Sequence, residues 1–205
     1  MSANPALSEP SETSTDETEA IPPLQTIGNA ALLNLPLVAL FCSTRLTGTA
    51  ILRLYDLAHA LRDMEIPVVG GFHTPMEGEC LRILLRGRQP IVVCPARSLE
   101  RIRIPIEWRP ALMEERLLIV SAFHGGNRRV TSELAERRNR LVFTLSRALI
   151  VGSAESRSRS ERWGMEALDA GKKVFTLDLP ENEKLRVLGA TACGARELAS
   201  RLGAL

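Results

Sequence analysis

The sequence predicts an α/β domain with an open, doubly wound, mostly parallel sheet and helices on both faces. Two observations support this prediction. Short apolar runs such as Leu37–Cys42 and Ile91–Cys94 are continuous rather than alternating, which is typical of strands buried on both faces. Amphipathic segments with helical periodicity separate these runs, and strands that alternate with helices form βαβ units. With 205 residues, 45% of them hydrophobic, the chain is long enough for one domain with a buried core.

The elements follow one another regularly along the chain. The predicted strands are Leu37–Ser43, Ile66–Val69, Ile91–Cys94, Leu117–Ser121, Ala148–Val151 and Lys173–Leu177. The predicted helices are Thr49–Met64, Glu77–Leu85, Thr131–Ser146, Ser158–Ala170 and Ala195–Leu202. In the first helix, Leu57, Leu61 and Met64 recur at the spacing of one helix face. The fourth helix ends at Gly171, a residue type that favours the helix C-terminus.

Charge divides the chain into two parts. Residues 1–24 carry five acidic residues and no Lys or Arg, so we expect a disordered acidic tail. Residues 25–205 form the predicted domain and hold 26 basic and 19 acidic residues, a net charge of +7. Of these basic residues 23 are Arg, which binds phosphate in a bidentate manner and suits a nucleic-acid or nucleotide ligand. A GC-rich genome favours Arg over Lys equally well, so composition leaves both explanations open.

Membrane proteins, secreted proteins and zinc proteins are disfavoured. No apolar run approaches the ~20 residues of a membrane span, and the N-terminus lacks the apolar segment of a signal peptide. We therefore expect a soluble, cytoplasmic protein without membrane contact. The Cys and His residues are scattered without metal-ligand spacing, so we expect buried, reduced thiols and no metal site. They are Cys42, Cys80, Cys94, Cys193, His59, His73 and His124.

The loops that follow the predicted strands are the candidate sites, because doubly wound sheets bind ligands at the carboxyl ends of their strands. Segments at these positions combine small polar residues, glycine and arginine, which suit phosphate oxygens. They contribute the candidate DNA- or phosphate-binding residues Ser43, Thr44, Arg45, Gly48, Gly70, Gly71, His73, Glu77, Arg138, Asn139, Arg140, Ser153, Ser158 and Ser160.

Each of these segments also has a purely structural interpretation. Cys42–Thr49 can be a polar turn that caps a helix, and Gly70-Gly71 can simply form a turn. Glu77 begins a predicted helix, where a carboxylate interacts well with the N-terminal dipole; acid–base catalysis is its alternative role. No G-x-S-x-G motif, Ser–His–Asp order or obvious acid pair is present. Nothing in the sequence demands an enzyme, and we expect no catalytic residues and no cofactor.

The order of motifs in residues 37–192 resembles the DNA-processing protein A family (DprA, also called Smf), in particular a short, stand-alone DprA-like branch. Ala135–Leu141 is similar to the start of the family's Arg-Asn-Arg helix, and Leu145–Val151 to the strand after it. Ser43-Thr44-Arg45 with Gly48 stands where the family has a Gly-Ser-Arg loop. The family's glycine-rich S-G-x-A-x-G-I-D loop falls on Gly70–Glu77, where Gly71 and the acid are kept. Its S-G-S turn falls on Ser158-Arg159-Ser160.

This resemblance implies a Rossmann-like fold and a non-catalytic protein that binds single-stranded DNA. It places phosphates in a basic pocket with Arg45, Arg138 and Arg140, beside the backbone of Gly70 and Gly71. It also implies a homodimer, a possible recombinase partner, and a role in DNA processing and recombination during natural transformation. With only 4% aromatic residues for base stacking, the affinity is expected to come from phosphate contacts and to depend on salt.

An alternative function belongs to the same superfamily. The lonely-guy phosphoribohydrolases and related nucleotide sensors use the same strand-end pocket for a single nucleotide. Their hydrolase signature P-G-G-x-G-T-x-x-E is absent from this sequence. A nucleotide-binding sensor or phosphoribohydrolase-like protein remains the alternative, distinguished by a closed pocket around Arg45, His73 and Glu77 rather than an open basic groove.

Overall fold

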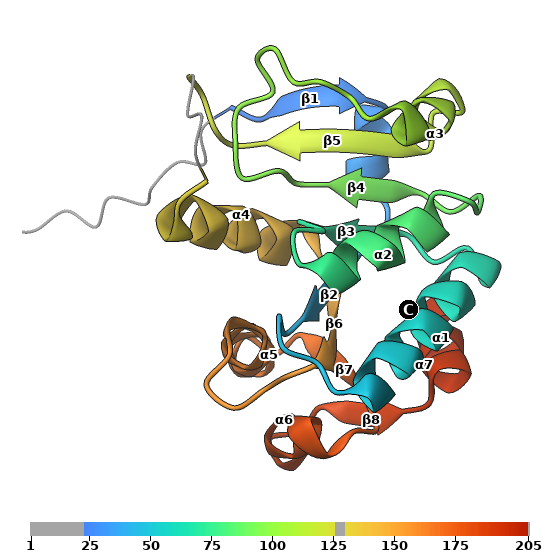
Figure 1. Cartoon of the computed structure of the whole chain (residues 1–205), viewed down its shortest axis with the longest axis vertical. Helices are drawn as coiled ribbons and strands as arrows, with labels where there is room; N and C mark the ends of the chain where they lie inside the picture. The colour runs from blue at the N-terminus through green and yellow to red at the C-terminus, as the bar shows by residue number, and fades with distance from the viewer. Residues whose placement is uncertain (1–22, 126–129, 205) are drawn as a thin grey trace, which may run out of the picture.

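The computed structural model describes residues 23–125 and 130–204, which are built around one eight-stranded sheet (Figure 1). The strand order is β1-β5-β4-β3-β2-β6-β7-β8. The strands are β1 (Gln25–Gly28), β2 (Val38–Cys42), β3 (Val68–Gly70), β4 (Ile91–Val93), β5 (Leu117–Ser121), β6 (Ala148–Ser153), β7 (Lys173–Leu177) and β8 (Thr191–Cys193). All neighbours are parallel except β1, which is antiparallel to β5. The predicted doubly wound, mostly parallel sheet is confirmed.

Helices connect these strands and begin at polar caps. The α-helices are α1 (Gly48–Asp63), α2 (Pro75–Leu84), α3 (Arg109–Met113), α4 (Ser132–Leu145), α5 (Arg159–Asp169), α6 (Glu183–Val187) and α7 (Ala195–Gly203). Short 3₁₀ turns are η1 (Ala30–Asn34), η2 (Ile106–Trp108) and η3 (Pro180–Asn182). The side chains of Thr47, Thr74, Thr131 and Ser158 each accept a backbone N–H in the first turn of α1, α2, α4 and α5 respectively. All five predicted helices are confirmed, with small shifts at their ends.

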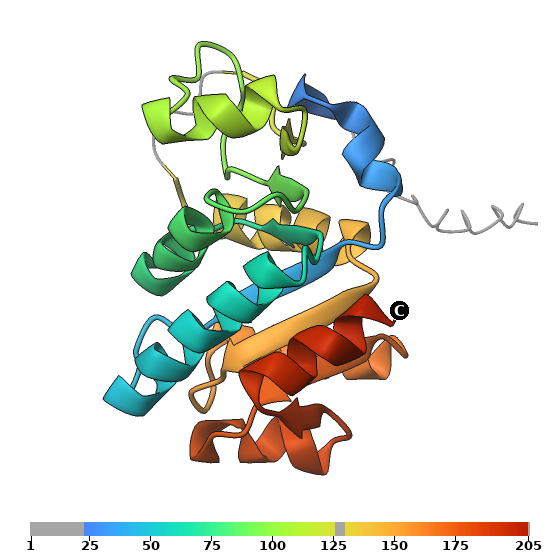
Figure 2. The ribbon, with the colours of Figure 1, turned by 90° about the vertical axis from the view of Figure 1, so that its right-hand side faces the viewer.

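The sheet has an apolar core on each face. On one face, Leu54 of α1, Leu84 of α2 and Leu198 of α7 pack in the same cluster; Figure 2 shows α1 and α7 lying across this face. On the other face, Val142 of α4 and Ala167 of α5 pack in a second cluster. Each fully buried leucine contributes about 2 kcal/mol through apolar area removed from water. The two cores therefore hold the strands and their connecting helices in fixed register.

The strand order reverses at β2, which lies between β3 and β6. From β2 the chain moves outward through β3, β4 and β5, returns through α4 to β6, and continues outward on the other side. The loops after β2 and β6 consequently diverge and leave a crevice. The pairing of β2 with β6 shifts register after Phe41, so that Cys42 pairs with Ser153. Such irregularities are common beside functional sites.

Some elements were not predicted, and part of the prediction lies outside the described residues. The edge strands β1 and β8 and the short helices α3 and α6 are additions to the predicted list. Apart from residues 23 and 24, the predicted acidic tail lies outside the described part of the chain, as do Arg128 and Arg129. Among the described residues, no helix is long and apolar enough to span a membrane.

Candidate functional site

A pocket of about 290 Å³ opens at the carboxyl ends of β2 and β6, where the strand order reverses. The β2–α1, β3–α2 and β6–α5 loops contribute to it, together with α4. Its lining residues are Phe41, Cys42, Ser43, Thr44, Arg45, Gly71, His73, Thr74, Glu77, Arg138, Asn139, Glu155, Ser158, Arg159, Ser160 and Trp163. Ten of the fourteen predicted site residues are among them, although the sequence places these ten in segments far apart.

Arg138 brings a buried cation to the pocket. It lies on α4 and is only 6% exposed. Its Nε donates a hydrogen bond to Asn139 Oδ1 at 2.7 Å, while within the described residues Nη1 and Nη2 have no hydrogen-bond partner. Burial lowers the pKa of this guanidinium and the nearby charge of Glu77 opposes the shift, but an arginine remains protonated at neutral pH. Arg138 therefore offers two nitrogens with unused N–H donors and a positive charge to a ligand.

Gly71 makes room for this guanidinium. A Cβ at Gly71 would lie 2.0 Å from Arg138 Nη1 and 2.4 Å from Cζ, so any larger residue would displace the side chain. Glycine at position 71 thus permits the close approach of an arginine, and its backbone does not have the positive φ that some turns demand. The preceding Gly70 instead faces the ring of Phe72, which would lie 3.0 Å from a Cβ at position 70, and it does not line the pocket.

Glu77 holds the loops of the pocket together. Its Oε1 accepts the backbone N–H of Cys42 at 3.2 Å, and its Oε2 accepts those of His73 at 3.0 Å and Thr74 at 3.2 Å. Thr74 in turn caps α2 through the N–H of Glu77, which completes a capping box. Burial raises the pKa of this carboxyl, while the three donated hydrogen bonds and Arg138 oppose the rise. The predicted capping role is confirmed, and Glu77 joins the ends of β2 and β3.

The first turn of α5 supplies hydroxyl and backbone groups. Ser158 caps this helix, and Ser158, Arg159 and Ser160 all line the pocket. The α2 N-terminus contributes Thr74 beside it. Helix N-termini carry partial positive charge and unpaired N–H groups, so both favour an anion in the pocket.

The mouth of the pocket carries a charged pair that joins two loops. Arg45 of the β2–α1 loop lies 3.7 Å from Glu155 of the β6–α5 loop, with side chains 86% and 48% exposed. Beneath this pair the N–H of Glu155 donates to the buried Ser43 Oγ at 2.9 Å. The two loops at the point of strand reversal are therefore linked by a backbone contact and by an exposed ion pair.

The inner end of the pocket is apolar and its thiol is inert. Phe41 and Trp163 stack on each other with ring centroids 6.2 Å apart. The indole Nε1 of Trp163 is buried and has no hydrogen-bond partner in the described part of the chain. Burial, assisted by the charge of Glu77, raises the pKa of the Cys42 thiol to about 12. A thiol with such a pKa is not a nucleophile at neutral pH.

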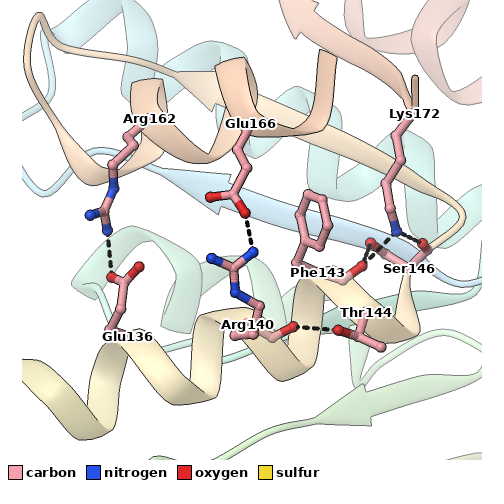
Figure 3. Close-up of polar contacts among 8 residues, drawn as sticks. All are labelled: Glu136, Arg140, Phe143, Thr144, Ser146, Arg162, Glu166 and Lys172. Carbon is pink, nitrogen blue, oxygen red and sulfur yellow. Dashed lines mark hydrogen bonds and ion pairs between the residues drawn. The ribbon is translucent and has the colours of Figure 1, made fainter. Parts of the chain in front are cut away.

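Four predicted site residues lie outside the pocket lining. Gly48 opens α1, Gly70 ends β3, and the buried Ser153 donates a hydrogen bond to Glu181 Oε1 at 3.2 Å. Arg140 pairs with Glu166 of α5 (Figure 3). Its guanidinium also lies 4.7 Å from the centre of the Trp163 ring. The pocket cations are Arg45, Arg138 and Arg159.

Arg140 belongs to a polar seam between α4 and α5. Figure 3 shows it beside the Arg162–Glu136 pair, in which Arg162 Nη2 and Glu136 Oε2 are 2.5 Å apart. Nearby, Lys172 Nζ donates to the carbonyls of Phe143 and Ser146 at 2.7 and 2.5 Å, where it satisfies the C-terminal end of α4. This seam links α4 to α5 and to the turn after α5 through side-chain contacts.

Sequence reasoning missed several pocket residues. Phe41, Cys42, Thr74, Glu155, Arg159 and Trp163 line it but were not predicted as site residues. Helical spacing contained a signal for Trp163, because Ser160 and Trp163 are three residues apart on one helix and so share a face. Within residues 23–125 and 130–204 no cluster of His, Cys, Asp and Glu could hold a metal ion.

Comparisons with known proteins agree with this architecture. The chain is similar in fold to DNA processing protein A from Helicobacter pylori, with 23% identity, a TM-score of 0.70 and coverage of 87% of this chain and 86% of that one. It resembles DprA from Streptococcus pneumoniae with 20% identity and a TM-score of 0.69, covering 85% of this chain but 64% of that one. The molybdenum cofactor carrier protein of Chlamydomonas reinhardtii gives 14% identity and a TM-score of 0.57, covering 83% of this chain and 100% of that one.

Family assignment rests on the sequence match rather than on these structures. No curated protein matches the chain. The family model for DNA recombination-mediator protein A matches residues 10–199, which is most of the sequence and includes every residue of the pocket. The chain therefore belongs to the DNA recombination-mediator protein A family.

Proposed function

We propose that this protein binds single-stranded DNA at the pocket between β2 and β6, as a non-catalytic component of DNA processing and recombination in natural transformation. The observation that carries the proposal is the buried Arg138, whose two terminal nitrogens have no hydrogen-bond partner in the described part of the chain. A buried cation with unused donors requires an anionic partner or water. Arg45, Arg159 and the first turn of α5 surround the same space, and together they suit one phosphate group.

The shape of the site favours a single strand over a duplex. A pocket of about 290 Å³ lies at the base of the crevice, so a phosphate must leave the line of a regular backbone to enter it. A flexible single strand makes such a turn readily, whereas duplex DNA is stiff over tens of base pairs. Because Phe41 and Trp163 are buried against each other, they are not available to stack on bases. Affinity then comes from phosphate contacts and falls with salt.

Binding without catalysis is supported by the state of two pocket residues, Glu77 and Cys42. Both carboxylate oxygens of Glu77 already accept backbone N–H groups, so this residue is committed to holding the loops. The Cys42 thiol, with a pKa raised to about 12, is not ionised at neutral pH.

The family resemblance supports the wider parts of the proposal. These are a homodimer, a recombinase as possible partner and a cytoplasmic location. The division into an acidic tail at residues 1–24 and a domain at residues 25–205 is part of the same proposal. The charge contrast between the acid-rich segment and the basic remainder supports the division.

A single nucleotide is the second candidate ligand, and the pocket volume favours it. About 290 Å³ lies near the lower limit of small-molecule sites and accommodates roughly one nucleotide. This candidate corresponds to a nucleotide sensor or a phosphoribohydrolase-like protein.

Fluorescence anisotropy of labelled oligonucleotides across a salt series separates the two candidates. A DNA-binding protein should bind single strands more tightly as they lengthen, with an affinity that falls as salt rises, and single nucleotides should displace them poorly. Duplex of the same length is the matched competitor. Absence of oligonucleotide binding, or easy displacement by one nucleotide, would transfer the assignment to the second candidate.

A further inference from the structure

The pocket contains acids as well as arginines, and this balance restricts which phosphate it accepts. Arg45, Arg138 and Arg159 line it together with Glu77 and Glu155. The positive charges of the three arginines are therefore partly offset within the lining. A phosphodiester within a strand carries one negative charge. A phosphate monoester has a second pKa of about 6, so its charge is close to two at pH 8.

The two acids differ in how they can act on a ligand. Glu77 is buried and both its oxygens are occupied by backbone donors, so it acts on the ligand only through the loops it holds. Glu155 lies at the mouth with its side chain 48% exposed, and its Oε1 is 3.7 Å from Arg45 Nη1. Its backbone N–H is anchored on Ser43 Oγ, so the base of the Glu155 side chain is held at the pocket entrance.

We propose that Glu155 is a specificity-determining residue that admits the singly charged phosphodiester of a continuous strand and disfavours the doubly charged phosphate of a free nucleotide or strand end. The inference rests on the proposed function and deepens it, because it names which phosphate of the DNA enters the pocket. The observation that supports the inference is the short distance between Arg45 and Glu155. A phosphate that contacts Arg45 within the pocket lies close to Glu155 as well, and each additional negative charge is then repelled by the carboxylate.

Two thymidine ligands that differ by one methyl group test this inference. Thymidine 5′-monophosphate is doubly charged at pH 8, and its phosphate methyl ester is singly charged but otherwise the same molecule. We expect the wild-type chain to bind the ester at least about threefold more tightly, the size of effect typical of a half-exposed charge pair. Saturation-transfer NMR with both ligands in competition, at constant ionic strength, measures the preference even when binding is weak.

Two variants test whether the preference for the methyl ester depends on Glu155. E155Q keeps the backbone contact to Ser43 and removes only the charge, so it should lose the preference or reverse it. E197Q removes the same charge on α7, where Glu197 pairs with Arg201 within one helix, and should retain the preference. Thermal unfolding of all three proteins verifies that each is folded.

The outcomes separate this inference from the proposed function. Equal binding of the two ligands by the wild type, an unchanged preference in E155Q, or no binding of either ligand would overturn the role of Glu155. None of these results affects the binding of a labelled oligonucleotide, measured by anisotropy on the same samples. Only failure of the oligonucleotide itself to bind would overturn the proposed function.

Discussion

The guanidinium of Arg138 lies directly over the Cα of Gly71, so that a Cβ at position 71 would stand 2.0 Å from Arg138 Nη1. One residue comes from α4, which follows β5, and the other from the loop after β3. In the pocket, the guanidinium of Arg138 thus occupies the space that a side chain at position 71 would fill. The position of the Arg138 guanidinium in the pocket is set by this contact together with the Asn139 hydrogen bond.

Replacing Gly71 by alanine should weaken single-stranded DNA binding by about tenfold, the loss expected when one charge-assisted hydrogen bond is removed. The displaced atoms are the end of a flexible side chain, so the free energy of unfolding should change little. Gly78→Ala is the matched control, because a Cβ at Gly78 meets no atom within 4 Å and alanine favours the α2 helix. Anisotropy titrations and urea denaturation of both variants provide the measurement; full affinity in Gly71→Ala would show that Arg138 does not contact the DNA.

Arg138 and Arg140 should contribute unequally, although they are two residues apart. Arg138→Met keeps most of the buried volume and should lower oligonucleotide affinity, with the slope of log affinity against log salt reduced by about one. Arg140→Met removes a guanidinium engaged with Glu166 and Trp163, so its effect on affinity and slope should be smaller. Titrations of both variants at several salt concentrations provide the comparison. Equal losses would place the DNA across the α4–α5 seam instead of in the pocket.

The different surroundings of Arg138 and Arg140 could not be predicted from the sequence. The Arg-Asn-Arg run predicted an anion site, and the period of the segment predicted its helix. However, residues i and i+2 lie on different sides of a helix, and only the packed neighbours decide which side meets the pocket. α4 carries Arg138 to the pocket and Arg140 to α5.

The predicted fold succeeded where apolar runs were long and continuous, as in β2 and β5, which are buried throughout. The strands that were missed are edge strands without such runs. β1 alternates half-buried and exposed residues, and β8 has three residues of which only Cys193 is buried. Loop residues such as Arg45 and Ser158 were predicted because strand ends converge at a reversal of strand order. Glu155 was not predicted as a site residue because its place at the pocket depends on its pairing with Arg45, 110 residues earlier in the chain.

Because of Glu77, the free energy of unfolding should contain a contribution that decreases as pH rises. Its pKa is raised by burial from 4.5, so the folded chain holds this proton more tightly than the unfolded chain does. The associated stability is fully present below about pH 4.5 and is lost as pH rises through the folded-state pKa. The free energy of unfolding of the wild type minus that of Glu77→Gln should therefore fall as pH rises above 4.5. Urea denaturation at several pH values between 4 and 8 measures this difference, with Glu79→Gln as a control for the loss of one charge. A difference that stays constant or increases with pH would contradict a raised pKa of Glu77 in the folded chain.

The Cys42 thiol should be unreactive in the folded protein although it lines the pocket. With a pKa raised to about 12, only about one thiol in 10⁴ is ionised at pH 8, and the thiolate is the nucleophile. Cys80, Cys94 and Cys193 are also buried with raised pKa values, so iodoacetamide should modify the native chain very slowly and the urea-unfolded chain at all four cysteines. Mass spectrometry of both samples gives the number of modified cysteines.

Cys42→Ser should retain oligonucleotide affinity within about twofold, because the thiol supplies no charge to the site. Rapid modification of one native cysteine, abolished in Cys42→Ser, would instead identify an activated nucleophile and would contradict binding without catalysis.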